Sequence, residues 1–242
     1  MSPVWTCHAY EVLWPSTIMD PRARLSGTRR SRQGRRLALP PSVLYGLRVN
    51  VRIVDVGYRS THYYLIQPPG GKRLLFDCGW PGTIGTFRSV LKRNGVSIED
   101  IGHILVSHFH PDHAGLVQEV KDAGALLIVT EAQIPFVKPL ERIAKPDSGY
   151  LPIRPGDNVV VNPEESREFL KGIGLDGEIL STPGHSPDSV SLILDEGLAF
   201  TGDLPHQILL TPEDREAHQS WARLKDRGVH TVYPAHGPPV SI

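Results

Sequence analysis

The chain of 242 residues is poor in cysteine, with two, and in aromatic side chains, which make up 7% of it. Cys7 and Cys78 form no CxxC pair, so we expect no disulfide framework and predict a reducing, cytoplasmic location. No apolar run is long enough to cross a membrane. The opening MSPVWTCHAYEVLWPSTIMD also lacks the basic and apolar regions of a secretory signal. We therefore expect neither a membrane protein nor a secreted one.

Net charge is lacking as well, because 26 Lys and Arg balance 26 Asp and Glu. The charge is unevenly spread: residues 1–50 hold eight Arg, no Lys and two acidic residues, so the remainder is mildly acidic. A mildly acidic body is poorly suited to binding a polyanion. We predict no nucleic-acid partner, and we leave a homodimer open.

The sequence divides into two parts of different character. Residues 21–48 carry eight Arg and no acid without sustained periodicity, which favours a disordered basic N-terminal extension over 1–48. A transit-like presequence and upstream sequence from a wrongly chosen start codon are the alternatives, so the place of 1–48 in the mature protein stays open. Residues 49–242 are predicted to form the folded domain, with ample length for a core.

From Val49 onward, short β-type runs alternate with stretches of helical spacing. Strands are expected at 51–56, 63–67, 72–79, 103–107, 125–130, 177–182, 189–194, 198–202 and 230–235, and helices at 83–95, 114–123, 163–172 and 212–227. This order predicts a layered α/β body. The proline-rich stretch 131–157 is the candidate lid or substrate-shaping insertion.

The stretch SHFHPDHAG gathers four metal-binding side chains, His108, His110, Asp112 and His113. Imidazole and carboxylate bind borderline metal ions such as zinc. The motif also stands where a buried strand ends and a helix begins, a common place for active sites. A chance cluster on a His-rich loop is the alternative, so the motif needs support from elsewhere in the chain.

Three further candidates support it. His185 in TPGHS, Asp203 in FTGD and His236 in YPAHG each follow an expected strand and stand beside a glycine, which lets the backbone turn sharply near a ligand. Taken singly, each would more often be structural. Taken together with the motif, they predict a metal site, and the number of ligands is enough for two ions.

The chain resembles the metallo-β-lactamase fold superfamily over about residues 50–237. The resemblance is carried by the motifs HFHPDH, TPGHS, TGD and PAHG, with FDCG upstream. The resemblance implies an α/β fold, a four-layer αββα sandwich with its site at the sheet edges. It also implies two zinc ions held by seven ligands. The implied sets are His108, His110 and His185 for the first ion, and Asp112, His113 and His236 for the second, with Asp203 bridging both and Asp77 orienting a ligand from behind.

The implied chemistry is hydrolysis. Two zinc ions about 3.5–4 Å apart share a water, lower its pKa towards neutrality and allow hydroxide to attack a carbonyl carbon. Asp112, His113 and Asp203 are then the catalytic residues, and the absence of a GxSxG elbow agrees with this. Zinc is expected, although iron and manganese also accept His and Asp ligands.

Residue identities narrow the family branch. His110 stands where flavo-diiron oxygen reductases have Glu, and Asp203 stands where true β-lactamases of this fold usually have Cys or Ser. An Asp there resembles glyoxalase II-like thioesterases and lactonases, whereas the helical glutathione domain of glyoxalase II is not expected after His236. The predicted function is hydrolysis of a small ester, thioester or lactone. A mononuclear iron oxidoreductase of the persulfide dioxygenase type, a β-lactam or phosphodiester hydrolase, and a non-catalytic metal-binding interaction protein are the alternatives.

A few other residues receive weaker predictions. His62 and His206 are candidates for substrate contact, against the ordinary alternatives of surface exposure or packing. Cys78 is expected to be a small buried residue. Ser186 and Ser189, on either side of Asp188, are expected to shape their loop by local hydrogen bonds. Tyr63 and Tyr64 are expected on opposite sides of a strand, one in and one out.

Overall fold

Two β-sheets form the centre of the structure, a computed structural model that describes residues 51–242. The predicted N-terminal extension, 1–48, lies outside the described residues. One sheet has six strands in the order β1-β2-β3-β4-β5-β6, and the other has five in the order β11-β10-β9-β8-β7. The strands are β1 (Arg52–Asp55), β2 (Tyr64–Gln67), β3 (Arg73–Phe76), β4 (Ile101–Leu105), β5 (Leu126–Val129), β6 (Val159–Val160), β7 (Gly177–Ser181), β8 (Val190–Leu194), β9 (Leu198–Gly202), β10 (Thr231–Pro234) and β11 (Val240–Ser241).

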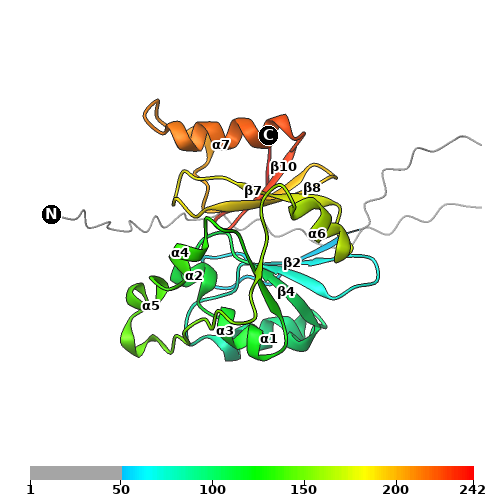
Figure 1. The fold of residues 1–242 in the computed structure, drawn as a ribbon, viewed down its shortest axis with the longest axis vertical. Coiled ribbons are helices and arrows are strands. Elements are labelled where there is room, and N and C mark those ends of the chain that lie inside the picture. The colour runs from blue at the N-terminus through cyan, green and yellow to red at the C-terminus, as the bar shows by residue number, and fades with distance from the viewer. Residues whose placement is uncertain (1–50) are drawn as a thin grey trace, which may run out of the picture. The chain divides into compact units, whose positions relative to one another are not determined.

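Helices cover the outer faces of both sheets. Figure 1 shows α1 (Ile84–Arg93) and α3 (Val117–Asp122) beneath the six-stranded sheet, and α7 (Arg215–Asp226) above the five-stranded sheet. The sheets face each other between these helical layers. The predicted four-layer αββα sandwich is confirmed.

The alternation of side chains along the strands explains why four layers form. In β3, Leu74 and Phe76 enter the core between the sheets, while Leu75 packs towards the helices. In β9, Phe200 enters the same central core and Ala199 packs under α7. Because successive side chains of a strand point to opposite faces, a strand that is apolar at every position must be covered on both sides.

The expected helix at 114–123 is in fact two short helices. The first, α2 (Pro111–Ala114), begins earlier, with proline in its first turn, where the missing N–H costs nothing. The backbone N–H groups of Gly115 and Leu116 then donate to carbonyls of the loop after β3. A side chain at Gly115 would collide with Pro81. This close approach of the loop interrupts the helix before α3.

Other differences from the expected elements are small. The helices expected at 163–172 and 212–227 begin three residues later, as α6 (Ser166–Gly172) and α7. The two-residue strands β6 and β11 were not predicted, because so short a pairing leaves no periodic pattern in a sequence. The stretch 131–157 contains single-turn helices α4 (Ile134–Val137) and α5 (Leu140–Ile143) and a 3-10 turn at Pro146–Ser148.

Strand direction brings the candidate ligands together. Strands β3 to β6 are parallel. In the other sheet, β8 is antiparallel to both β7 and β9, and β9 is parallel to β10, so β7, β9 and β10 share one direction. Loops that follow the parallel strands of a sheet therefore leave from one edge, where α/β proteins commonly place their sites.

No helix among residues 51–242 is both long enough and apolar enough to cross a membrane.

Candidate metal centre

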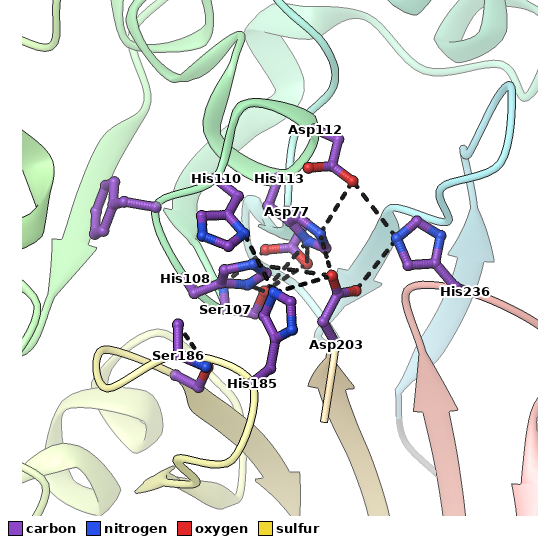
Figure 2. Close-up of polar contacts among 12 residues, drawn as sticks. Asp77, Ser107, His108, His110, Asp112, His113, His185, Ser186, Asp203 and His236 are labelled. Atoms are coloured by element: carbon purple, nitrogen blue, oxygen red, sulfur yellow. Dashed lines mark hydrogen bonds and ion pairs between the residues drawn. The ribbon is translucent and has the colours of Figure 1, made fainter. Parts of the chain in front are cut away.

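Three histidines form the first ligand set. His108 and His110 lie in the loop after β4, and His185 lies in the loop after β7. The donor nitrogens of the three lie within 4.8 Å of one another, and His185 Nε2 is 3.2 Å from His110 Nδ1. Figure 2 shows the three rings converging from two loops. These are the three histidines that the resemblance assigns to one ion.

The second set combines two carboxylates with two histidines. Asp112 and His113 belong to α2, Asp203 follows β9 and His236 follows β10. Their ligand atoms also lie within 4.8 Å of one another. His113 Nε2 is 3.3 Å from Asp112 Oδ2, and His236 Nε2 is 3.5 Å from the same oxygen.

Asp203 stands between the two sets. Its Oδ2 is 3.3 Å from His113 Nε2 of the second set, and 3.5 Å and 3.9 Å from Nε2 of His185 and His108 of the first. Gly202 lets the end of β9 approach the loop after β4, because a Cβ at this position would collide with the Ser107 side chain. One carboxylate therefore faces both sets, as a bridging ligand would.

The donor set fits a divalent cation. Nε2 of His108 and Nε2 of His113 are buried, and neither makes a hydrogen bond within the described part of the chain. A buried polar atom without a partner costs about 1–3 kcal/mol. Imidazole nitrogens and carboxylate oxygens that converge in this way supply ligands of the type that zinc and similar metals prefer. A metal ion would satisfy both nitrogens.

Asp77 supports the second set from behind. It is fully buried, and its Oδ2 lies 2.9 Å from His113 Nδ1. Its Oδ1 accepts the backbone N–H of Ser107 at 2.6 Å, and its Oδ2 accepts the Ser107 hydroxyl at 2.9 Å. The Asp77 backbone has φ of 60°, a conformation that non-glycine residues hold only when their surroundings fix it. The contact turns His113 Nε2 towards the ligand cluster. That Asp77 orients a metal ligand stays a prediction.

The surroundings lower the pKa of Asp112 and Asp203, and they also lower the pKa of His108 and His110. Burial lowers the pKa of His108 well below its usual value, with the neighbouring imidazoles adding to the effect. Burial also opposes the charge of Asp112, but polar contacts with His113 and His236 lower its pKa overall. Burial alone would lower the pKa of His113, yet the carboxylates of Asp77, Asp112 and Asp203 raise it well above normal. Three carboxylates so close together favour the binding of a cation.

Two residues that hold the site together were not predicted. Ser107 connects Asp77 to the loop that carries the first histidines. Asp188 accepts the backbone N–H of Phe109 at 2.8 Å. The sequence could have shown only that Ser107 opens the motif and that Asp188 follows a ligand, because both contacts join segments far apart in the chain. The expected local bonds do form: the Ser186 hydroxyl donates to Asp188 and lies 3.0 Å from the Ser189 hydroxyl.

His62 and His206 lie outside both ligand sets. His62 Nδ1 is 2.6 Å from Asp55 Oδ2, and its backbone N–H donates to the carbonyl of Ala235, beside His236. His206 Nδ1 accepts the N–H of Ile208 and caps a 3-10 turn. Its ring also meets Trp221 edge-on. Substrate contact by either histidine stays a prediction.

Two predictions about neighbouring residues have different outcomes. Cys78 is fully buried, as expected. The expectation of one buried and one exposed tyrosine is wrong, because Tyr63 and Tyr64 are both buried. They do point to opposite faces: Tyr63 packs on the helical side and Tyr64 between the sheets. A strand enclosed on both faces has no exposed side.

Together, the two-sheet sandwich and the His/Asp cluster at its edge define a protein with a site suited to a divalent metal. The chain belongs to the metallo-beta-lactamase superfamily, whose family profile matches residues 56–236.

Named relatives agree with this assignment. A "Probable metallo-hydrolase" of Methanocaldococcus jannaschii is 29% identical, over 77% of this chain and 92% of its own length. The "Lactamase-like protein nscB" of Aspergillus fumigatus is 31% identical over 74% of this chain, and a "Beta-lactamase-like protein 2 homolog" of Caenorhabditis elegans is 28% identical over 74%. This chain spans 48% and 57% of those two proteins.

Among solved structures, a metallo-beta-lactamase family protein of Thermus thermophilus has a TM-score of 0.63 at 21% identity. The match covers 81% of this chain and 76% of that one. Identity this low shows the shared fold alone.

Proposed function

We propose that this protein is a dinuclear zinc hydrolase that cleaves a small ester, thioester or lactone. The observation that carries the proposal is the position of Asp203, whose carboxylate faces His108 and His185 on one side and His113 and His236 on the other. A carboxylate with ligands on both sides suits a pair of ions. The relative that this chain matches over most of its length is named as a metallo-hydrolase, which supports hydrolysis.

The residues of the site divide the work among themselves. His108, His110 and His185 would hold one ion; Asp112, His113 and His236 would hold the second, with Asp203 between. A bound pair of such ions supplies an activated water and stabilises negative charge on the substrate carbonyl. Because its pKa is lowered, Asp112 stays a carboxylate at neutral pH and is available to hold a cation.

The substrate class rests on residue identity. Asp203 stands where the thioesterase and lactonase branches of the family carry Asp, and a carboxylate rather than a thiol faces the site. We propose a small-molecule substrate in the cytoplasm and no nucleic-acid partner.

The first test measures metal content by elemental mass spectrometry on protein reconstituted with zinc. We expect about two zinc ions per chain, with both affinities reduced in Asp203→Ala because one ligand is lost from each set. Asp195→Ala is the matched control. Asp195 is an exposed carboxylate that directly follows β8 and pairs with Arg167. This variant should keep both ions. Absence of bound metal in the wild type would refute the proposal.

The second test is a panel of thioesters, lactones, a chromogenic cephalosporin and a nitrophenyl phosphodiester. Hydrolysis of a thioester or lactone that disappears in His110→Ala, but persists in the exposed-histidine variant His218→Ala, is the expected result. Turnover restricted to the cephalosporin or the phosphodiester would replace the proposed substrate class. One iron ion per chain with oxygen consumption would instead favour the persulfide dioxygenase type of reaction.

A further inference from the structure

The Asp188 side chain connects the two loops that supply the first ligand set. Its carboxylate is buried, with 3% of the residue exposed. Oδ2 accepts the backbone N–H of Phe109 at 2.8 Å, and Oδ1 accepts the hydroxyl of Ser186 at 2.7 Å. Phe109 stands between His108 and His110 in the sequence, and Ser186 follows His185. One carboxylate therefore bonds to the immediate neighbours of all three ligands.

The surroundings of Asp188 fix the carboxylate in place. Ser189 Oγ lies 3.0 Å from Ser186 Oγ and accepts the Ser186 N–H at 3.3 Å, which closes the turn around Asp188. The N–H of Val190 donates to the carbonyl of Ser107 at 2.8 Å, so the start of β8 is bonded to the start of the histidine motif. The Phe109 side chain is itself buried. The two loops are thus joined on either side of the first ligand set.

We propose that Asp188 is the positioning residue of the first metal site, as Asp77 is of the second. The two acids act differently: Asp77 bonds directly to a ligand ring at 2.9 Å, whereas Asp188 bonds to backbone and hydroxyl groups beside the ligands. Asp188 fixes the separation between the loop after β4 and the loop after β7. The inference rests on the proposed two-metal centre.

The expected magnitude follows from the role. Loss of a group that orients metal ligands typically lowers metal affinity about 10–100-fold. Because both side-chain bonds of Asp188 lie beside ligands of the first set, its removal should weaken one of the two metal-binding steps and leave the other near its wild-type value. A general structural role would instead weaken both steps alike.

The experiment measures the two stepwise zinc affinities of the full chain by competition with a chromogenic chelator. Asp188→Ala should lower one affinity about 10–100-fold. Asp188→Asn should restore most of it, because the amide oxygen can accept from Phe109 N–H while its NH₂ donates to Ser186 Oγ. Asp195→Ala, the exposed-carboxylate control directly after β8, should match the wild type.

Double variants identify the affected site. In a His185→Ala background, which already lacks a first-set ligand, Asp188→Ala should cause little further loss. In a His236→Ala background it should remove most of the remaining binding, because the first set is then the intact one. Such non-additivity is expected only for residues that act on the same site. Thermal unfolding of the metal-free proteins reports whether each variant folds. If Asp188→Ala does not fold, Ser186→Ala replaces it: the carboxylate is retained, and a smaller loss of zinc affinity at the first set is expected.

Several outcomes would overturn the inference. Positioning by hydrogen bonds would be contradicted if Asp188→Ala and Ser186→Ala both kept the wild-type zinc affinities. It would also be contradicted if Asp188→Ala weakened both sites equally, or if Asp188→Asn bound zinc as weakly as Asp188→Ala. These results differ from a failure of the proposed function, in which the wild type itself would bind fewer than two ions.

Discussion

Cys78 and Asp77 are neighbours with opposite chemical roles. Asp77 turns its carboxylate towards His113, while the Cys78 thiol packs into the core on the helical side of the six-stranded sheet. Successive residues leave the end of a strand in opposite directions, so only one of the pair can face the ligands. This explains why a thiol so near a candidate metal centre is not among the gathered ligands.

We predict that Cys78 is unreactive in the folded protein. Burial raises the pKa of its thiol well above the usual value, with the nearby acids Asp77 and Glu119 adding to the shift. Because the thiolate is the reactive form, a disulfide reagent at pH 8 should modify Cys78 far more slowly than a free cysteine. The measurement uses Cys7→Ser, in which Cys78 is the remaining thiol, with and without denaturant. Rapid modification of the native protein would contradict the buried position.

At the scale of elements, the stretch 131–157 is attached to the body at both ends. Near its start, Gln133 Nε2 donates to the carbonyl of Val106 at 2.8 Å. Near its end, the buried ammonium of Lys121 in α3 donates to the carbonyl of Arg154 at 2.5 Å and pairs with Asp157 at 2.7 Å. Its middle is held by Leu140, which is fully buried. The contacts describe an anchored insertion, and its influence on substrate access stays a prediction.

We predict that Lys121→Ala loosens the end of this stretch. The change leaves the Arg154 carbonyl without its ammonium partner, which should lower the free energy of unfolding by about 1–3 kcal/mol. Hydrogen exchange at residues 144–158 should accelerate more than exchange in β4 or β9, because the lost contacts are local. The control is Lys92→Ala, which removes an exposed lysine from the last turn of α1. Equal protection in both variants would show that Lys121 does not anchor the stretch.

At the scale of the whole molecule, all seven candidate ligands and Asp77 come from the described residues, within 77–236. They are carried by loops from both sheets, so a two-metal site requires that the sheets be packed together. The central core, which includes Phe76, Leu105 and Phe200, supplies that packing. The metal centre is therefore a property of the complete sandwich rather than of either sheet.

We predict that a chain lacking residues 1–48 retains the thermal unfolding midpoint and the zinc content of the full chain. The reason is that the sandwich and both ligand sets are complete within 51–242. Differential scanning calorimetry and elemental analysis of the two proteins make the comparison. A large fall in either quantity would show that the N-terminal part contributes to the domain, contrary to the predicted boundary.

The sequence by itself indicated most of the strands and helices and named the candidate ligands. Apolar runs such as LLF of β3 and VSLIL of β8 predict strands, because these positions are buried between two layers. The spacing of His108, His110, Asp112 and His113 predicts a metal site, because few other functions require so many metal-binding side chains in one short segment. Patterns of this kind are local, and local patterns can be read along the chain.

The tertiary structure decided the rest. It joined Asp188 to Phe109 and Ser107 to Asp77, divided one expected helix at Gly115, and placed Asp203 between the two ligand sets. Each of these depends on two segments, distant in sequence, that come within a few ångströms of each other. No local pattern records such a distance, since it is fixed only when strands pair and the two sheets pack.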